Sequence, residues 1–185
     1  MRYLFLMMLA TSPGFGWCDS DNDGDTDTDT DTGPAECTMD LGEYDGHFAI
    51  RSQSDIATLA GYTSISGELV ISCPACRDLS ELICLTSVGD LFFICDSFSL
   101  TNLDGLDALT SVGGEFRIWG CSDLTSLDGL GAFTYVSEAI VIHHNESLPD
   151  CEVCDLLDQF TTEPPYIGVG TNLNDVCTPV PSSCP

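Results

Sequence analysis

Cysteine is the residue type of this chain with the most possible covalent chemistry, because the 185 residues include 11 cysteines. Two Cys-x-x-Cys motifs, Cys73–Cys76 and Cys151–Cys154, have the spacing of zinc ligands or of redox-active thiols. They lie far apart in the sequence, and neither opens a helix that follows a strand, so we expect disulfides instead. A high density of cysteine is typical of an oxidising compartment. The candidates for disulfide bonds are Cys37, Cys73, Cys76, Cys84, Cys95, Cys121, Cys151, Cys154, Cys177 and Cys184.

Aspartate could bind calcium near the N-terminus, where Asp occupies every odd position from 19 to 31. The segment Asp19–Gly24 matches the opening of an EF-hand loop, but the twelfth position holds Thr30 instead of the bidentate glutamate. We therefore expect weak, nonspecific Ca²⁺ binding at most, and no cofactor. Like charges with no apolar residue among them predict a disordered acidic tether over residues 18–36.

His143 and His144 are the remaining candidates for metal binding or catalysis. The pattern of apolar residues before them places His143 on the outside of a strand and His144 at its end, so we interpret them as a solvated surface pair. The sequence contains no Ser-His-Asp order, no H-E-x-x-H motif and no phosphate-binding loop. We predict no catalytic residues, no bound metal and no enzymatic activity. Asn145-Glu-Ser147 is a glycosylation sequon, which matters only in a eukaryotic source.

The N-terminus has the order of a secretory signal, since Met1-Arg2 precedes the apolar run Tyr3–Ala10. This run is shorter than the about 20 residues that span a bilayer. We therefore expect a signal peptide over residues 1–17 and an exported protein. Cys18 stands where bacterial lipoproteins carry their lipidated cysteine, so lipid attachment there would anchor the chain at the cell surface. Trp17 departs from the small residue usual before that cysteine. A disulfide of Cys18, or its removal with the signal and secretion of the chain, stays open.

The charge of the chain restricts its partners. The sequence holds 30 acidic side chains against 4 basic ones, a formal net charge of -26. Nucleic acid is excluded as a partner, because binding it requires Lys and Arg to neutralise phosphates. An anionic membrane surface is disfavoured for the same reason, so membrane contact is expected only through a lipid anchor.

A repeat of 24 residues organises most of the sequence. Similar segments start at Leu85, Leu109 and Phe133, each 24 residues after the one before, and an earlier copy starts at Tyr62. Leucines follow each segment with L-x-x-L-x-x-L spacing. Repetition at such a period is typical of a solenoid, in which each unit buries its apolar face against its neighbours. The repeat predicts a mainly β fold: a leucine-rich, parallel β-solenoid with a period of about 24 over residues 37–185.

Each unit is expected to contain one short strand, because apolar residues alternate there with a period of two. The predicted inward residues are Leu69, Ile71, Phe92, Ile94, Phe116, Ile118, Ile140 and Ile142. The predicted outward residues include an aromatic and arginine cluster of the kind found in binding hot spots. This predicted binding face consists of Phe93, Arg117, Trp119, Val141 and His143. The predicted binding face would be lost if a loop or a partner domain covered this side of the sheet, or if the strand register were shifted by one residue.

The two ends of the repeat predict short capping helices. Before the first unit, residues 48–50 predict a strand and Asp55 is the expected N-cap of a helix. After the last unit, residues 150–160 predict an amphipathic helix that Pro164-Pro165 stops, and residues 166–169 predict a final strand.

Cysteines replace leucines at this last unit, where Cys151 and Cys154 occupy leucine positions. We therefore expect their side chains to point inward. The sequence predicts that Cys177 or Cys184 bonds to one of them and ties the tail over the open end of the repeat.

The segments Leu109–Ile118 and Ser126–Leu130 resemble units of receptor L-domains, the leucine-rich domains of insulin-receptor and EGF-receptor ectodomains. Related units occur in bacterial surface proteins, and the resemblance covers roughly residues 48–175. It implies a right-handed solenoid at the cell surface, but no ligand-contact residue can be carried over. We expect a non-catalytic, cell-surface or secreted module that binds a protein or glycan through the sheet face. The alternative is a structural envelope protein without a specific ligand.

Overall fold

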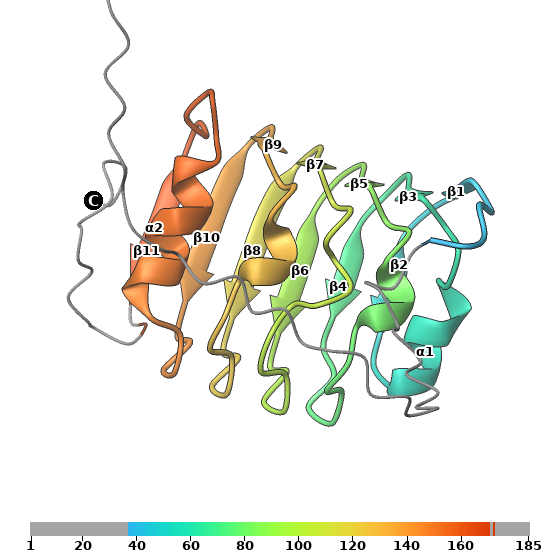
Figure 1. The fold of residues 1–185 in the computed structure, drawn as a ribbon, viewed down its shortest axis with the longest axis horizontal. Helices are drawn as coiled ribbons and strands as arrows, with labels where there is room; N and C mark the ends of the chain where they lie inside the picture. Colours follow the sequence, from blue (N-terminus) through green and yellow to red (C-terminus); the bar gives the residue numbers. More distant parts are fainter. Residues whose placement is uncertain (1–36, 171, 173–185) are drawn as a thin grey trace, which may run out of the picture. The chain divides into compact units, whose positions relative to one another are not determined.

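The computed structural model describes residues 37–170 and 172, and in this part the chain is mainly β-structure (Figure 1). The strands form two sheets in which every neighbouring pair is parallel. One sheet has six strands in the order β11-β10-β8-β6-β4-β2, and the other has five in the order β1-β3-β5-β7-β9. The predicted mainly β architecture with parallel strands is therefore confirmed.

The six-stranded sheet contains the strands that the alternating apolar residues predict. Its members are β2 (Phe48–Ile50), β4 (Leu69–Ile71), β6 (Phe92–Cys95), β8 (Glu115–Trp119), β10 (Ala139–His143) and β11 (Ile167–Gly170). The register pairs Leu69 with Phe92, Phe92 with Phe116, and Phe116 with Ile140. All eight predicted inward residues are buried. The outward residues Val70, Phe93, Arg117 and Val141 are half-buried, so the predicted choice of face is confirmed.

The five-stranded sheet differs from the expectation of one strand in each unit. Its members are β1 (Glu43–Tyr44), β3 (Ser64–Ile65), β5 (Ser87–Val88), β7 (Ser111–Val112) and β9 (Tyr135–Val136). Four of these strands come from a repeated segment that reads Thr-Ser-Val in two units and Thr-Ser-Ile or Thr-Tyr-Val in the other two, and the last residue of the segment is buried. Strands of two residues are too short to show an alternating pattern, so the periodicity gives no signal for them.

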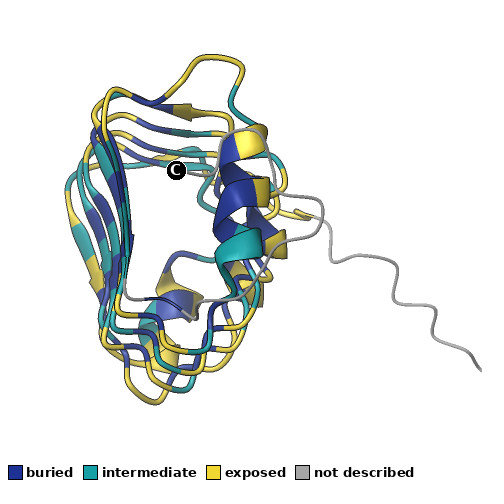
Figure 2. Ribbon diagram, turned by 90° about the vertical axis from the view of Figure 1, so that its left-hand side faces the viewer, coloured by how far each residue is buried: buried dark blue, intermediate teal, exposed yellow. Residues whose placement is uncertain are grey.

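Buried side chains of both sheets and of the leucine segments fill the interior. Figures 1 and 2 show the helical segments on the side opposite the six-stranded sheet. They include the 3₁₀ turns η1 (Ser80–Leu82) and η2 (Asp128–Leu130). Three buried phenylalanines from successive units stack through the core, with ring centroids 5.4 Å apart for Phe92 and Phe116 and 4.9 Å apart for Phe116 and Phe133. Contacts between neighbouring units thus carry the hydrophobic stabilisation, as expected for stacked repeats.

The N-terminal helix corrects the predicted cap. Helix α1 (Gln53–Thr58) begins before Asp55, and its N-cap is Ser52. The carboxylate of Asp55 accepts hydrogen bonds from the backbone N–H groups of Arg51 (2.8 Å) and Ser52 (2.9 Å). These hydrogen bonds, above all the one from Arg51, lower the pKa of Asp55. Asp55 is therefore the third helical residue of a capping box, which a serine three positions before an acidic residue also indicates.

The C-terminal elements match the predictions more closely. Helix α2 (Asp150–Asp158) lies within the predicted residues 150–160, and β11 provides the final strand. The helix buries Val153, Leu156 and Leu157.

Several predictions fall on residues 1–36 and 173–185, which lie outside the described residues. They are the signal peptide, the acidic tether with its calcium binding, lipid attachment at Cys18, and the tail cysteines. Within residues 37–170 and 172, no helix is long and apolar enough to cross a membrane.

Candidate functional site

The strand register brings the predicted binding-face residues together on the outer side of the six-stranded sheet. Phe93 of β6 pairs with Arg117 of β8, and Arg117 pairs with Val141 of β10. One step along the same face, Trp119 pairs with His143. Residues paired in this way in adjacent strands have neighbouring side chains. The five residues therefore form one continuous patch, called the sheet-face patch below.

Trp119 is the exposed centre of this patch, with 43% of its surface accessible. Its indole stacks on the ring of His144, with centroids 4.4 Å apart and planes inclined by 26°. The ring of His143 lies 5.7 Å from it at 33°. His144, which the sequence predicts only as a surface residue at the end of the strand, therefore lies directly against the sheet-face patch.

A left-handed corner places His144 against Trp119. Asp96, Gly120 and His144 occupy the same position in successive units, one residue after the strand, and have φ values of 50°, 71° and 59°. This left-handed region is costly for most residues, although Asp, Asn and His adopt it more readily. The turn directs the ring of His144 back over the sheet, where it meets the indole.

The glycines of β11 support His143. In the register, His143 pairs with Gly170. A Cβ atom on Gly170 would lie 3.1 Å from Cε1 of His143, and one on Gly168 would lie 3.4 Å from Nε2. The ring of His143 therefore rests on backbone that has no side chains, and this leaves it beside Trp119.

Arg117 supplies the only positive charge of the sheet-face patch apart from any protonated histidine. Its guanidinium forms an ion pair with Glu115, and 42% of the side chain is accessible. The Nε atom of Arg117 is buried and has no hydrogen-bond partner among the described residues. A partially exposed guanidinium beside Phe93 and Trp119 can bind a carboxylate, a carbonyl or an aromatic ring.

A buried polar network holds the corner behind Trp119. The side-chain oxygen of Asn145 accepts a hydrogen bond from the N–H of Cys121 (3.0 Å), and its amide nitrogen donates to the carbonyl oxygen of Ile118 (3.3 Å). Asn172 donates to the carbonyl oxygen of Ile142 in the same way (3.2 Å). Asn145 is fully buried, so the sequon at this residue is not presented at the surface.

Disulfides account for part of the predicted cysteine chemistry. Cys37 is bonded to Cys84, and Cys73 is bonded to Cys76. Cys151 and Cys154 are also disulfide-bonded. Since Cys177 and Cys184 lie outside the described residues, the disulfide that would tie the C-terminal tail to Cys151 or Cys154 stays a prediction. Disulfides of this kind are typical of an oxidising environment.

Cys95 and Cys121 are free thiols, in contrast to the expectation that they form disulfides. Cys95 lies on the outer side of β6 and is half-buried, whereas Cys121 is fully buried at the corner after β8. The two side chains therefore extend to opposite sides of the backbone layer. Burial raises the pKa of both thiols, that of Cys121 to about 11, so neither is activated as a thiolate at neutral pH.

No protein-family model matches this chain, and a search of curated proteins gives no match. The described residues contain no cluster of three or more His, Cys, Asp or Glu side chains placed to hold a metal ion. The sheet-face patch is therefore the candidate site on the basis of its own geometry.

Proposed function

We propose that this chain is a non-catalytic binding module, displayed at the cell surface or secreted, that presents the sheet-face patch to a protein or glycan. The observation that carries this proposal is the register of β6, β8 and β10, which gathers Phe93, Arg117 and Trp119 in one place. Aromatic residues and arginine dominate the energetics of binding surfaces. A right-handed solenoid with a period of about 24 residues is the scaffold that the proposal assumes, because such a scaffold keeps the patch rigid.

The surroundings of the patch favour a role in ligand binding over a purely structural role in the cell envelope. Trp119 exposes 43% of its surface in a chain that is otherwise strongly acidic, and exposed apolar surface of this kind often marks an interaction site. One of the 4 basic residues of the whole chain, Arg117, lies within the same patch. A structural envelope protein without a ligand would have no need to keep these two residues adjacent on an open sheet face.

The test is a binding screen with the full chain against a glycan array and a phage-displayed random peptide library. We expect selected probes to lose binding about 30-fold or more when Trp119 is replaced by alanine, the loss typical of a hot-spot residue. Phe98→Ala is the matched control, since Phe98 is an exposed aromatic residue (47%) outside the strands of both sheets and should have no effect on these probes. Equal losses for both variants, or no selected probe at all, would favour the envelope protein.

A further inference from the structure

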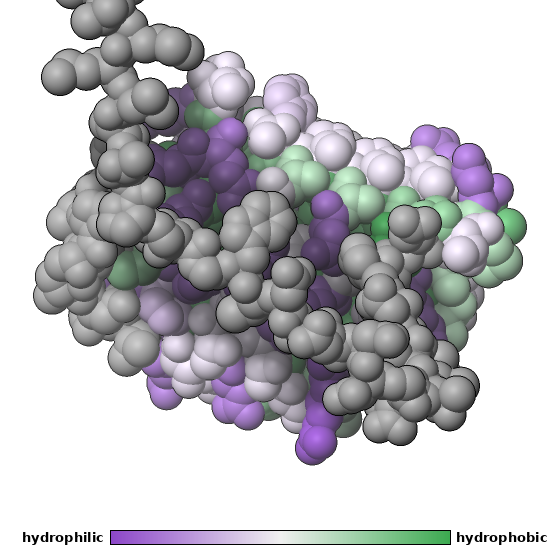
Figure 3. Space-filling model, viewed as in Figure 1, coloured by the Kyte–Doolittle hydropathy of each residue, from purple (hydrophilic) through white to green (hydrophobic). Residues whose placement is uncertain are grey.

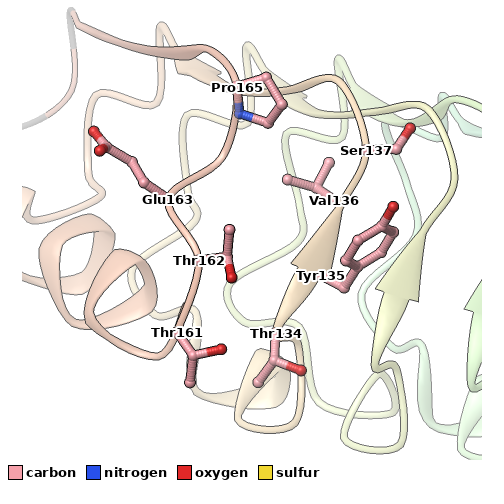
Figure 4. Close-up of a pocket in the computed structure, with 8 residues that line it drawn as sticks. All are labelled: Thr134, Tyr135, Val136, Ser137, Thr161, Thr162, Glu163 and Pro165. Carbon is pink, nitrogen blue, oxygen red and sulfur yellow. The ribbon is translucent and has the colours of Figure 1, made fainter.

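The five-stranded sheet ends at β9, although the chain has one more segment in the equivalent place. Counting back along the chain from the pairs of β10 and β11, residues 161–164 correspond to residues 134–137 of the preceding unit, although the two segments are not paired. Residues 134–137 include β9, but residues 161–164 form no strand. Figure 4 shows this segment lying across a gap from β9.

The first reason for the gap is the side chain at the inward position. Ile65, Val88, Val112 and Val136 fill this position in the four preceding units and are at most 5% exposed. By the same count the corresponding residue of the last unit is Glu163, whereas the buried residue of this segment is Pro164. If residues 161–164 paired with β9, its carboxylate would enter the apolar core, which is strongly unfavourable for an unpaired charge. Glu163 is instead exposed and turned away from β9 (Figure 4).

The second reason is a missing hydrogen-bond donor. In three successive units, the residue after the inward position donates its N–H to the carbonyl oxygen of the preceding unit. These bonds run from Gly89 to Ile65 (2.8 Å), from Gly113 to Val88 (2.8 Å) and from Ser137 to Val112 (3.1 Å). The aligned residue of the last unit is Pro164, which has no N–H to donate. Among the described residues, the five-stranded sheet therefore ends at β9.

The outer edge of β9 consequently offers free backbone groups. The carbonyl oxygens of Thr63, Thr86 and Thr110 each accept hydrogen bonds from the next unit. The carbonyl oxygens of Thr134 and Val136 hold the equivalent positions in the last strand of the sheet. No described residue donates a hydrogen bond to either of them. Tyr135 and Ser137 direct their N–H groups toward β7, so the peptide groups of Val136 point toward the gap.

The gap is a defined cavity of about 260 Å³. It is slightly smaller than the about 300–1,000 Å³ typical of sites for drug-sized ligands. Figure 4 shows Thr161, Thr162 and Pro165 on one side of it and β9 on the other. In Figure 3 the surface over the short strands is mostly pale, because Thr, Ser and Gly recur there, and Glu163 is the charged residue among those that line the cavity.

We infer that the edge of β9 is a second binding site, which accepts a short extended segment of a partner protein as an added parallel strand. The expected segment has four consecutive positions. The first holds a residue with a hydroxyl group, the second any residue, the third a β-branched apolar residue, and the fourth a residue whose backbone N–H is free to donate. This is the pattern of Thr110-Ser111-Val112-Gly113 in the chain's own repeat. The first and last N–H groups donate to Thr134 and Val136, and the apolar side chain covers Val136. Strand addition to an open sheet edge is a known mode of peptide recognition.

Two other occupants fit the edge less well. A second copy would bring β1, the opposite edge of the same sheet, and Asp40, Glu43 and Asp45 lie on or beside that strand. These carboxylates would face Glu163. The chain's own segment Thr178–Pro181 has proline at its second and fourth positions, so it lacks the last donor.

The probe for the test is a capped, fluorescein-labelled peptide with the sequence of residues 109–115. We expect it to bind the full chain and to shift the NMR amide signals of residues 134–137 and 161–165. The same peptide with sarcosine at the position of Gly113 loses one N–H and should bind at least about tenfold more weakly, because a backbone carbonyl is left unpaired. This control leaves the protein unchanged.

The matched protein variants are Glu163→Val/Pro164→Gly and Glu163→Gln. The double variant allows the chain's own segment to pair with β9, so the peptide should no longer bind, whereas Glu163→Gln keeps the proline and the site. Trp119→Ala should leave peptide binding unchanged, which separates this site from the sheet-face patch. Equal binding of the sarcosine peptide, or undiminished binding to the double variant, would overturn the inference. So would peptide-sensitive dimerisation, which would identify a second copy as the occupant, or a Val136 amide that is already protected from exchange without peptide, since this N–H faces the gap.

Discussion

At the scale of single residues, Cys121 shows how one position of the repeat accepts different side chains. Cys73, Ser97, Cys121 and Asn145 occupy this corner position in successive units, and all four are buried. The hydroxyl of Ser97 accepts a hydrogen bond from the N–H of Cys73 (3.3 Å), as Asn145 does from Cys121. The thiol of Cys121 donates only a long hydrogen bond to the carbonyl oxygen of Trp119 (3.9 Å), so this residue behaves largely as a small apolar side chain.

The raised pKa of Cys121 predicts a loss of stability in alkaline solution. Burial raises this pKa from 9.0 to about 11, so the folded chain keeps the proton at a pH where the unfolded chain releases it. The free energy of unfolding should therefore fall as the pH rises from 9 to 11, by about 2–3 kcal/mol from this residue. The measurement is urea unfolding at several pH values in that range, for the wild type and for Cys121→Ser.

Serine is the matched replacement, because Ser97 already occupies the same position one unit earlier. Tyrosines and other groups titrate in both proteins, so the difference between the two unfolding curves isolates the thiol. Parallel pH profiles for wild type and variant would show that Cys121 does not contribute.

The sheet-face patch was only partly predictable at this scale. Alternation of apolar residues is sufficient to place Phe93, Arg117 and Trp119 on one face, since the side-chain period of a strand is fixed. The stack of His144 on Trp119 depends on a left-handed backbone at His144. No alternating pattern encodes such a turn for a non-glycine residue, although the aligned Gly120 is a signal for it.

At the scale of elements, close packing between units depends on the glycines that follow the short strands β5 and β7. A Cβ atom on Gly113 would lie 2.2 Å from the carbonyl oxygen of Gly89. Gly131, in contrast, has only the carbonyl oxygen of Asp128 within contact, at 3.5 Å. These two glycines lie in the same repeat and form a natural pair for substitution.

We predict that Gly113→Ala destabilises the protein by about 1–3 kcal/mol, since backbone of the neighbouring unit must shift. Gly131→Ala should change the free energy of unfolding by less than about 0.5 kcal/mol or raise it slightly, because alanine restricts the unfolded chain. Urea denaturation monitored by circular dichroism compares the two. Equal stability of both variants would mean that the units pack less closely than the contact distances indicate.

The sheets were also predictable to different degrees. Strands of three to five residues in β4, β6, β8 and β10 show alternation, so the sequence locates them. The two-residue strands of the five-stranded sheet offer one buried residue each, which no period can detect. Their signal is the repetition itself, since Thr-Ser-Ile, Thr-Ser-Val and Thr-Tyr-Val stand at the same place in successive units. The absence of a further strand after β9 can also be explained from the sequence, by Glu163 and Pro164, but only after the strand register is known.

At the scale of the whole molecule, stacked units have few contacts beyond their neighbours, so the ends depend on additional bonds. The disulfide between Cys37 and Cys84 joins residues separated by 47 positions, and so links the segment before β1 to the end of the repeat unit that starts at Tyr62. The sequence alone could not select this pair from the ten candidates, because connectivity follows from the three-dimensional register and not from spacing. Cys84 is nearly buried, which holds the N-terminal segment against the core.

We predict that Cys37→Ala/Cys84→Ala lowers the free energy of unfolding by about 4 kcal/mol, the chain-entropy value for a closed loop of this length. Cys95→Ala is the control, because it removes a half-buried free thiol and should cost under about 1 kcal/mol. Urea denaturation gives the two values, and hydrogen exchange locates the effect. If the disulfide between Cys37 and Cys84 secures the N-terminal end, the amides of β1 and β2 lose their protection from hydrogen exchange first in the double variant. The amides of β8 and β10 keep theirs. A double variant as stable as Cys95→Ala would show that neighbour packing alone holds that end.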